Sequence, residues 1–255
     1  MNPSGEVGVH ELVSYLDSVL EAGRFRDYCP NGLQVEGTRP VRRLVAGVSA
    51  SLALVEAAVE RGADALLVHH GYFWKGESPV LVGVKRRRLA ALLGAGVSLI
   101  AYHLPLDAHP QWGNNAQFGH LLGWTATGAF GGEPPLALHG RLAEPLSGAV
   151  LAERLAVALG RAPQWIAAGA RPIERVAWCT GAAQDLLEEA AAQGVHAFVS
   201  GEISERTVHL ARESGVDYFA AGHHATERLG VQALAAHLGE RYGLAWEYVE
   251  LDNPA

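Results

Sequence analysis

The sequence comprises 255 residues, of which 49% are hydrophobic and 18% are charged. Such a chain can bury a large core and leaves little room for long disordered segments. Its formal net charge of -7 and its pI near 5.9 exclude bulk electrostatic attraction as a means of holding nucleic acid or an anionic membrane. A local basic pocket is compatible with this charge.

The cysteines and the first twenty residues predict a cytoplasmic protein. Cys29 and Cys179 lie far apart and belong to no CxxC pair, so neither a disulfide framework nor a thiolate zinc site is predicted. The first twenty residues lack the basic region followed by an apolar region that is typical of a signal peptide. No later stretch of about eighteen apolar residues is free of charge, as a membrane-spanning helix would require. We therefore expect a soluble, unprocessed protein of the reducing cytoplasm with no membrane partner.

The first half of the chain alternates between helical and strand patterns. Leu12, Leu16 and Leu20 have helical spacing, and this predicted helix stops at Gly23, which suits a left-handed cap. The patterns that follow predict strands over 43–49, 63–70 and 97–103 and helices over 52–60, around 85–93 and from about residue 114. This alternation is the βαβ rhythm of a parallel sheet.

A change of composition at residues 125–135 marks the best candidate for a domain boundary, because Gly, Pro and Thr replace the hydrophobic periodicity there. The alternation then resumes, with strands predicted over 136–142, 174–181, 197–201, 217–222 and 245–251 and helices over 149–159, up to 193, 205–214 and 225–238. We predict an α/β fold of two linked βα-alternating domains with mainly parallel sheets. Residues 1–125 and about 223–255 form the first domain, and residues 126–222 form the second.

Polar side chains gather where the predicted strands end, which is where open α/β sheets place their ligand sites. His69 and His70 close an apolar strand, and adjacent strand residues point to opposite faces, so each histidine could serve one metal ion. His103 ends another strand, and Asp107 lies four residues on in a turn-like segment. Hydrogen-bonded core histidines and a turn-capping aspartate would explain the same residues without a metal, although a pair of adjacent histidines weakens that interpretation.

The motif AAGHHATERLG predicts two further ligands. His223 and Glu227 are four residues apart at the start of a predicted helix, so they share one helical face and can bind one ion together. An exposed pair on a helix is the alternative. His224 points elsewhere and is predicted to pack beside the ligands rather than to bind.

The motif FVSGEISERTVH brings Glu202 and, more distantly, His209 to the end of another strand. A carboxylate near a metal-activated water can accept a proton or orient a ligand, so Glu202 is the candidate catalytic residue. A helix cap formed by Ser204 explains the local sequence equally well. His103 and His209 are candidates for supporting the ligands or transferring protons.

These strand ends together predict a site for two divalent metal ions between the two domains. The proposed ligands are imidazoles and carboxylates without sulfur, a set that suits zinc, manganese, iron, cobalt or nickel without choosing among them. A carboxylate that bridges two ions about 3.5 to 4 Å apart is typical of two-metal hydrolases, and either carboxylate of the set could be that bridge. The predicted ligands are His69, His70, Asp107, His223 and Glu227.

Other motifs carry less weight. The basic run KRRR at Lys85–Arg88 could attract a triphosphate, although such runs usually form a solvated helix face. The segment PNGLQVEG at 30–37 is a polar loop that could reach the site, and Cys179 is better explained as a small buried thiol than as a nucleophile. No P-loop, no GxGxxG motif after a strand and no GxSxG elbow is present, which disfavours the corresponding enzyme classes.

The ordered motifs PNGLQVEG, VHHGYFWKG, YHLPLDAHPQWGNNAQ, SGEISERTVHLARE and AAGHHATERLG resemble the NGG-interacting-factor-three-like family, also known as GTP cyclohydrolase I type 2 homologues. The resemblance covers nearly the whole chain. It implies a toroid-shaped homohexamer and a dinuclear metal centre that faces the interior of the ring. It further implies that His69 and Asp107 bind one ion, His70 and His223 bind the other, and Glu227 bridges both.

Two functions are compatible with this resemblance. The first is a dinuclear-metal-dependent hydrolase that opens the imidazole ring of GTP or a related nucleotide, with loss of formate, by attack of metal-activated water. The second is a metal-binding ring-shaped scaffold or regulator without turnover. The acidic charge makes nucleic acid an unlikely partner. Five ligands for two ions leave room for water, which favours the hydrolase.

Overall fold

The computed structural model describes residues 5–169 and 171–255, which divide into two compact units. Unit 1 comprises Met1–Leu106 and Gly230–Asp252, and unit 2 comprises Asp107–Leu229 and Asn253–Ala255. The chain passes from one unit to the other within the helices α4 (Leu104–Ala108) and α9 (His223–Tyr242), and again between Asp252 and Asn253. The division into folding domains expected from the sequence, near residues 125 and 222, stays a prediction.

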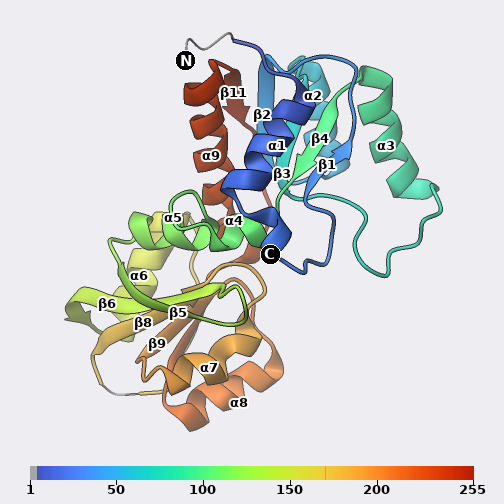
Figure 1. The fold of residues 1–255 in the computed structure, drawn as a ribbon. Coiled ribbons are helices and arrows are strands. Elements are labelled where there is room, and N and C mark those ends of the chain that lie inside the picture. Colours follow the sequence, from blue (N-terminus) through green and yellow to red (C-terminus); the bar gives the residue numbers. More distant parts are fainter. Residues whose placement is uncertain (1–4, 170) are drawn as a thin grey trace. The chain divides into compact units, whose positions relative to one another are not determined.

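Unit 1 is built on a five-stranded sheet in the order β1-β4-β3-β2-β11 (Figure 1). The pairs between β2 and its neighbours and between β3 and β4 are parallel, and β1 runs antiparallel to β4. The strands are β1 (Gly32–Val35), β2 (Arg43–Ser49), β3 (Ala65–His70), β4 (Ser98–Ala101) and β11 (Ala245–Tyr248). The helices are α1 (Val9–Val19), the 3-10 turn η1 (Ala22–Arg24), α2 (Leu52–Glu60), α3 (Gly83–Ala95) and the part of α9 from Gly230.

The core of unit 1 forms because apolar side chains of the parallel strands pack against apolar faces of helices. Val45, Leu66 and Leu99 lie in one buried cluster with Leu54 of α2 and Leu92 of α3. Side chains on α1 and α9 also meet, since the Tyr15 hydroxyl lies 2.5 Å from Nε2 of His237. Each fully buried aliphatic side chain contributes about 1.5–3 kcal/mol to the free energy of folding. This packing therefore holds the carboxyl ends of β3 and β4 in place.

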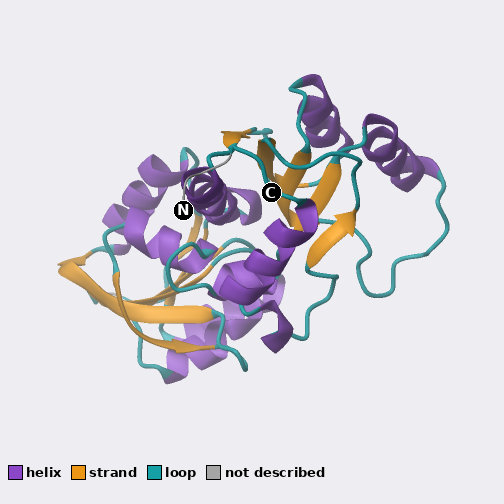
Figure 2. Cartoon of the chain, turned by 45° about the horizontal axis from the view of Figure 1, so that its top comes forward, coloured by secondary structure: helices purple, strands orange, loops and turns teal. Residues whose placement is uncertain are grey.

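Unit 2 contains a six-stranded mixed sheet in the order β5-β6-β8-β9-β10-β7, with helices on both faces (Figure 2). β8, β9 and β10 are parallel to one another, whereas β5, β6 and β7 pair antiparallel with their neighbours. The strands are β5 (Thr125–Phe130), β6 (Ala137–Leu146), β7 (Gln164–Ile166), β8 (Ile173–Cys179), β9 (Ala197–Ser200) and β10 (Asp217–Ala220). The helices are α5 (Asn114–Leu121), α6 (Gly148–Leu159), η2 (Gln184–Leu186), α7 (Leu187–Ala192), α8 (Glu205–Ser214) and the start of α9.

The central strands of unit 2 alternate between two cores. Trp178 of β8 packs in a cluster with Phe118 of α5 and Leu155 of α6, while Cys179 packs in a second cluster with Leu187 of α7 and Ala211 of α8. This is the two-residue period of a strand that is buried on both faces. The carboxyl ends of β8, β9 and β10 therefore emerge together at one edge of a rigid sheet.

The α/β fold class predicted from the sequence is confirmed, and three segments differ in detail. Residues 125–135, expected to be an irregular boundary, contain β5, and the polar loop expected at 30–37 contains β1. β7 was not predicted, and with β5 and β6 it makes the second sheet mixed rather than mainly parallel. Among the described residues, none of the helices combines the length and the apolar character that crossing a membrane requires.

Candidate metal centre

Three histidine side chains meet at the carboxyl ends of β3 and β4 in unit 1. The rings of His69 and His70 lie 4.5 Å apart, centre to centre, and His103 lies 5.1 and 5.6 Å from them. His69 is fully buried, and its Nδ1 lies 2.9 Å from the carbonyl of Tyr102, which can only accept, so Nδ1 carries the proton. This tautomer turns the Nε2 lone pair away from the Tyr102 carbonyl, as in histidines that bind metal through Nε2. The expected alternation along the strand does not keep the two rings apart, and His70 is the last residue of β3.

His103 is held by a carboxylate that the sequence did not single out. Oδ1 of Asp27 lies 2.7 Å from Nδ1 of His103, and Oδ2 accepts the backbone N–H of Leu104 at 2.9 Å. Asn31 completes the contact by accepting the N–H of His103 at 2.8 Å. Burial alone would raise the pKa of Asp27, but the hydrogen bond and charge of His103 outweigh it and lower the pKa. Asp27 therefore stays ionised and fixes the orientation of the His103 ring.

In unit 2, glycines follow the parallel strands where the candidate ligands begin. The N–H of Gly201 donates to the carbonyl of Gly181 at 2.8 Å, and the N–H of Gly222 donates to Gly201 at 2.9 Å. Gly181 has a φ of +69°, and a Cβ atom there would lie 2.1 Å from Oε1 of Glu227. A side chain at Gly201 would likewise collide with the backbone of His223. These glycines leave the space in which the ligand side chains lie.

His223 lies between two carboxylates, and this is the most informative contact of unit 2. Its Nδ1 is 2.7 Å from Oε1 of Glu202, and its Nε2 is 3.1 Å from Oε2 of Glu227. Burial lowers the pKa of His223, but the hydrogen bonds and charges of Glu227 and Glu202 outweigh burial and raise the pKa to about 9. Without a metal the imidazole carries a proton toward Glu227. A divalent ion at Nε2 would take the place of that proton.

Asp107 belongs to a buried hydrogen-bond network at the carboxyl end of β8. Its Oδ1 accepts the amide of Asn114 at 2.9 Å and lies 3.5 Å from the hydroxyl of Thr180. Asn115 donates to the Asp107 carbonyl at 3.3 Å and accepts the N–H of Thr180 at 2.9 Å. The side chain of Asp107 is 8% exposed, so these contacts orient a carboxylate that is largely withdrawn from water.

Cys179 lies beside this network and does not serve as a nucleophile. Burial, together with the nearby carboxylates of Asp107 and Glu227, raises the pKa of the Cys179 thiol far above its ordinary value. A thiol of this kind stays protonated and unreactive near neutral pH. The structure therefore agrees with the prediction of a small buried side chain.

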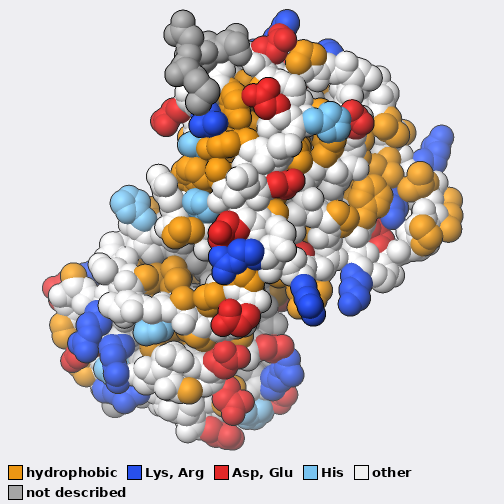
Figure 3. All heavy atoms as spheres, viewed as in Figure 1, with side chains coloured by type: hydrophobic (Ala, Val, Ile, Leu, Met, Phe, Trp, Pro, Cys, Tyr) orange, Lys and Arg blue, Asp and Glu red, His pale blue; other side chains and the backbone are white. Residues whose placement is uncertain are grey.

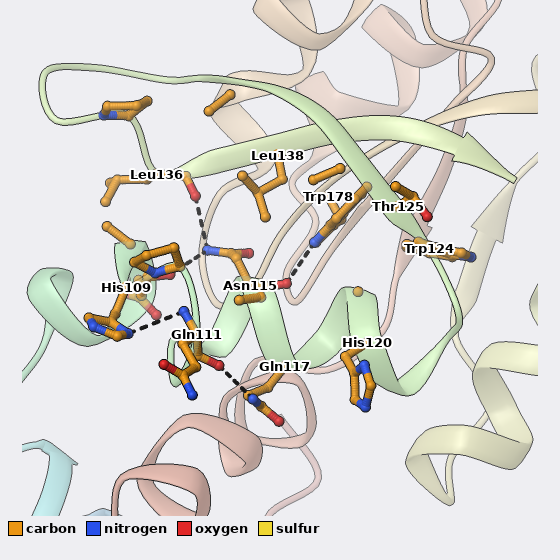
Figure 4. Close-up of a pocket in the computed structure, with 18 residues that line it drawn as sticks. His109, Gln111, Asn115, Gln117, His120, Trp124, Thr125, Leu136, Leu138 and Trp178 are labelled. Atoms are coloured by element: carbon orange, nitrogen blue, oxygen red, sulfur yellow. Dashed lines mark hydrogen bonds between the residues drawn. The ribbon is translucent and has the colours of Figure 1, made fainter.

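A cavity of about 710 Å³ lies against Asp107 in unit 2, between α5 and the strands β5 and β6. Figure 4 shows Leu138 and Trp178 on the side of the strands and Gln117 along α5. Asn115 fixes one wall, since its carbonyl accepts the indole N–H of Trp178 at 2.8 Å. The described residues around the cavity include neither lysine nor arginine. Its size falls within the range of small-molecule sites, and its walls suit an uncharged ring better than a polyphosphate.

Other residues singled out from the sequence lie as follows. His209 is on the exposed face of α8, where its Nε2 lies 2.8 Å from Oε1 of Glu205, and its supporting role stays a prediction. His224 donates its backbone N–H to the carbonyl of Ala255 at 3.2 Å. Ser204 forms a capping box at the start of α8, so the cap and the contact between Glu202 and His223 occur together.

The donors of both units are suited to divalent metal ions. Unit 1 offers imidazole nitrogens from His69, His70 and His103 that lie within 4.8 Å of one another. Unit 2 offers His223 and two buried carboxylates, Asp107 and Glu227. His69 and His223 are each oriented through Nδ1, the arrangement that protein sites use to present Nε2 to an ion. The glycine at position 181 keeps room for Glu227 rather than filling the space with a side chain.

Fold and donor sets together define an α/β protein with the side chains of a metal site. The model of the family Duf34/NIF3 (NGG1p interacting factor 3) matches residues 7–254, so the chain belongs to this family, as its motifs predicted. It is 56% identical over 247 residues to a protein of Allochromatium vinosum named GTP cyclohydrolase 1 type 2 homolog, with 97% of each chain covered. It is 50% identical over 246 residues to the protein of the same name from Escherichia coli, covering 96% of this chain and 98% of that one.

Solved structures agree with this assignment. A protein named ybgI, described as of unknown function, has 49% sequence identity and a TM-score of 0.95 over 98% of this chain and 100% of its own. A protein from Thermus thermophilus has 37% identity and a TM-score of 0.88, covering 96% of this chain and 99% of that one. These likenesses extend over both units.

Proposed function

We propose that this protein is a dinuclear-metal-dependent hydrolase that opens the ring of a guanine nucleotide or a related heterocycle by metal-activated water, as a GTP cyclohydrolase does. The observation that carries the proposal is the position of His223 between Glu202 and Glu227, with Gly181 making room for Glu227. The His223 imidazole is 25% exposed, is fixed at Nδ1 by Glu202 and faces the buried carboxylate of Glu227. This is the ordinary arrangement around a catalytic metal ion.

Within this proposal the ligands are those that the family resemblance implies. If the resemblance holds here, His69 and Asp107 would hold one divalent ion, His70 and His223 would hold the other, and Glu227 would contribute to both. Zinc, manganese, iron, cobalt and nickel all suit these donors. Ions bound there would supply Lewis acidity and would lower the pKa of a coordinated water.

The side chains around the ligands have separate tasks. One oxygen of Glu202 orients His223, and we propose that this 44% exposed carboxylate also accepts a proton from the attacking water. His103, held by Asp27, is the second candidate for moving a proton, because its Nε2 remains available while Nδ1 faces Asp27. We propose that the cavity beside Asp107 accommodates the heterocycle, since the described residues that line it include neither lysine nor arginine to bind phosphates.

The family resemblance supports two further proposals about the whole protein. We propose that it assembles with itself into a ring-shaped homohexamer and that it acts in the cytoplasm on a small-molecule nucleotide. A ring that binds metal without turnover, acting as a scaffold or regulator, is the alternative that the following experiment separates from the enzyme.

Turnover tests the proposal. The full chain, loaded with each candidate metal in turn, should release formate from GTP or a related nucleotide, and the Glu227→Gln variant should lose that activity by about a hundredfold or more, because one shared ligand is removed. Glu205→Gln is the matched control, since Glu205 lies exposed on α8 with its side chain 87% accessible. Metal-loaded protein that releases no formate from any guanine nucleotide would favour the scaffold.

A further inference from the structure

Unit 1 contains a second cavity, at the start of α3, that the proposed metal centre does not use. Its volume is about 310 Å³, and its walls come from the first turns of α3 and from the loop that follows β3. The surface over α3 and this loop presents apolar side chains beside lysine and arginine side chains (Figure 3). The residues that line the cavity are Tyr72, Glu77, Val82, Val84, Lys85 and Arg88.

Arg88 provides the cavity with an uncompensated cation. Its guanidinium lies over the ring of Tyr72, 5.9 Å from the ring centre. Its Nε is buried and has no hydrogen-bond partner among the described residues, and no carboxylate of the described chain forms an ion pair with Arg88. A buried N–H of a charged group that is left unpaired costs more free energy than one lost neutral hydrogen bond. The position of Arg88 therefore points to an anionic ligand.

Lys85 has a different task, because its charge is already compensated. Its Nζ lies 3.2 Å from Oε1 of Glu77 and donates to the carbonyl of Ser78 at 2.8 Å. The same ammonium lies 5.3 Å from the centre of the Phe73 ring. Lys85 thus fastens the loop after β3 to α3 and builds the wall of the cavity. Trp74 of the same loop packs 6.0 Å from His70, so the loop also borders the histidine cluster.

The first turn of α3 adds a second attraction for an anion. α3 is 13 residues long and begins after Val82 without a side-chain cap. The free N–H groups of a helix start and the positive end of the helix dipole favour negative charge. Lys85 and Arg88 are three residues apart and therefore lie on the same side of α3, whereas Arg86 and Arg87 are exposed. The basic run is thus split between a cavity wall and a solvated face.

We propose that this cavity binds the phosphate group of a small phosphorylated molecule, with Arg88 and the first turn of α3 as its donors. The guanidinium fork matches phosphate oxygens, and the cavity, at about 310 Å³, has room for a phosphate or diphosphate group. Lys85 is already paired with the carboxylate of Glu77, so Arg88 is the cation that can pair with an anion in this cavity. The inference goes beyond the proposed hydrolase, because phosphate binding here requires neither metal nor turnover.

Calorimetric titration of the full chain with inorganic pyrophosphate at low ionic strength tests this site. Arg88→Gln should weaken binding by about tenfold to a hundredfold, the range for a lost charge-assisted hydrogen bond, and Arg88→Lys should weaken it less. Arg87→Gln removes the same charge from the exposed side of α3 and should leave the affinity within about twofold. Equal affinities of the parent and Arg88→Gln, both folded by thermal unfolding, would overturn the proposal.

Two further titrations test whether the phosphate of a nucleotide binds here and whether this site is independent of the proposed metal centre. GTP should displace pyrophosphate from the parent protein, whereas guanosine, which lacks phosphate, should not. The dependence on Arg88 should persist in the Glu227→Gln variant, in which the proposed centre is damaged. If guanosine competes as well as GTP, or if Glu227→Gln abolishes the effect of Arg88→Gln, the anion site is not at α3.

Discussion

At the scale of single residues, His223 is held in one orientation by two carboxylates. Glu202 holds Nδ1, so the ring cannot turn, and Glu227 faces Nε2. The two carboxylates keep a proton on the imidazole with a pKa of about 9. Metal binding must expel this proton, so the affinity for metal should rise with pH.

The same contacts predict how the stability of the metal-free protein depends on pH. The pKa of His223 is raised from 6.5 in the unfolded chain to about 9 in the folded one, so its stabilising contribution is complete below pH 6.5 and disappears as the pH rises through 9. Urea unfolding in the presence of a chelator, from about pH 6 to about pH 10, measures this loss. A His223→Gln variant should lack that part of the pH dependence, and an unchanged profile in the variant would contradict the assignment.

The sequence predicted some of these residues and missed others for a physical reason. The spacing of His223 and Glu227 carries its own geometry, because residues four apart share one helical face, and the structure places their side chains 3.1 Å apart. Asp27 lies in a loop between η1 and β1, and Asn115 opens a helix. Neither position shows which side chain it will meet, since their contacts with His103 and Thr180 depend on how distant segments fold.

At the scale of elements, the strand ends determine where the donors lie. The alternation of helices and strands could be predicted because buried parallel strands are apolar runs separated by amphipathic helices. β5 could not, because TATGAF consists mostly of small exposed residues and becomes a strand only by pairing with β6. Edge strands such as β5 and β7 depend on a partner strand rather than on their own hydrophobic pattern.

The glycine at the end of β8 makes this element-level account testable. Gly181→Ala should destabilise the fold by about 1 kcal/mol for the left-handed backbone and by roughly 1–3 kcal/mol more for the collision with Glu227, and it should lower metal content. Gly215→Ala is the matched control, since Gly215 has a φ of +67° but no atom within 4 Å of an added Cβ. Denaturant unfolding and elemental analysis measure both effects. Equal losses in the two variants would show that Glu227 does not need the space.

At the scale of the whole molecule, the family match covers residues 7–254 and the ybgI protein superposes with a TM-score of 0.95. Each unit carries its own donors at the carboxyl ends of parallel strands, and each is oriented by contacts within that unit. The five ligands that the family resemblance implies come from both units, so the proposal requires donors from each of them. This requirement is the central claim about the molecule.

The measurement that tests this claim most directly is the metal content of the full chain, purified without chelators, by elemental analysis. We expect about two divalent ions per chain in the parent and in Glu205→Gln, and clearly less in His70→Ala from unit 1 and in Glu227→Gln from unit 2. Loss in both variants would show that donors from each unit take part in metal binding. A parent protein that retains no metal after incubation with zinc, manganese or iron would contradict the account.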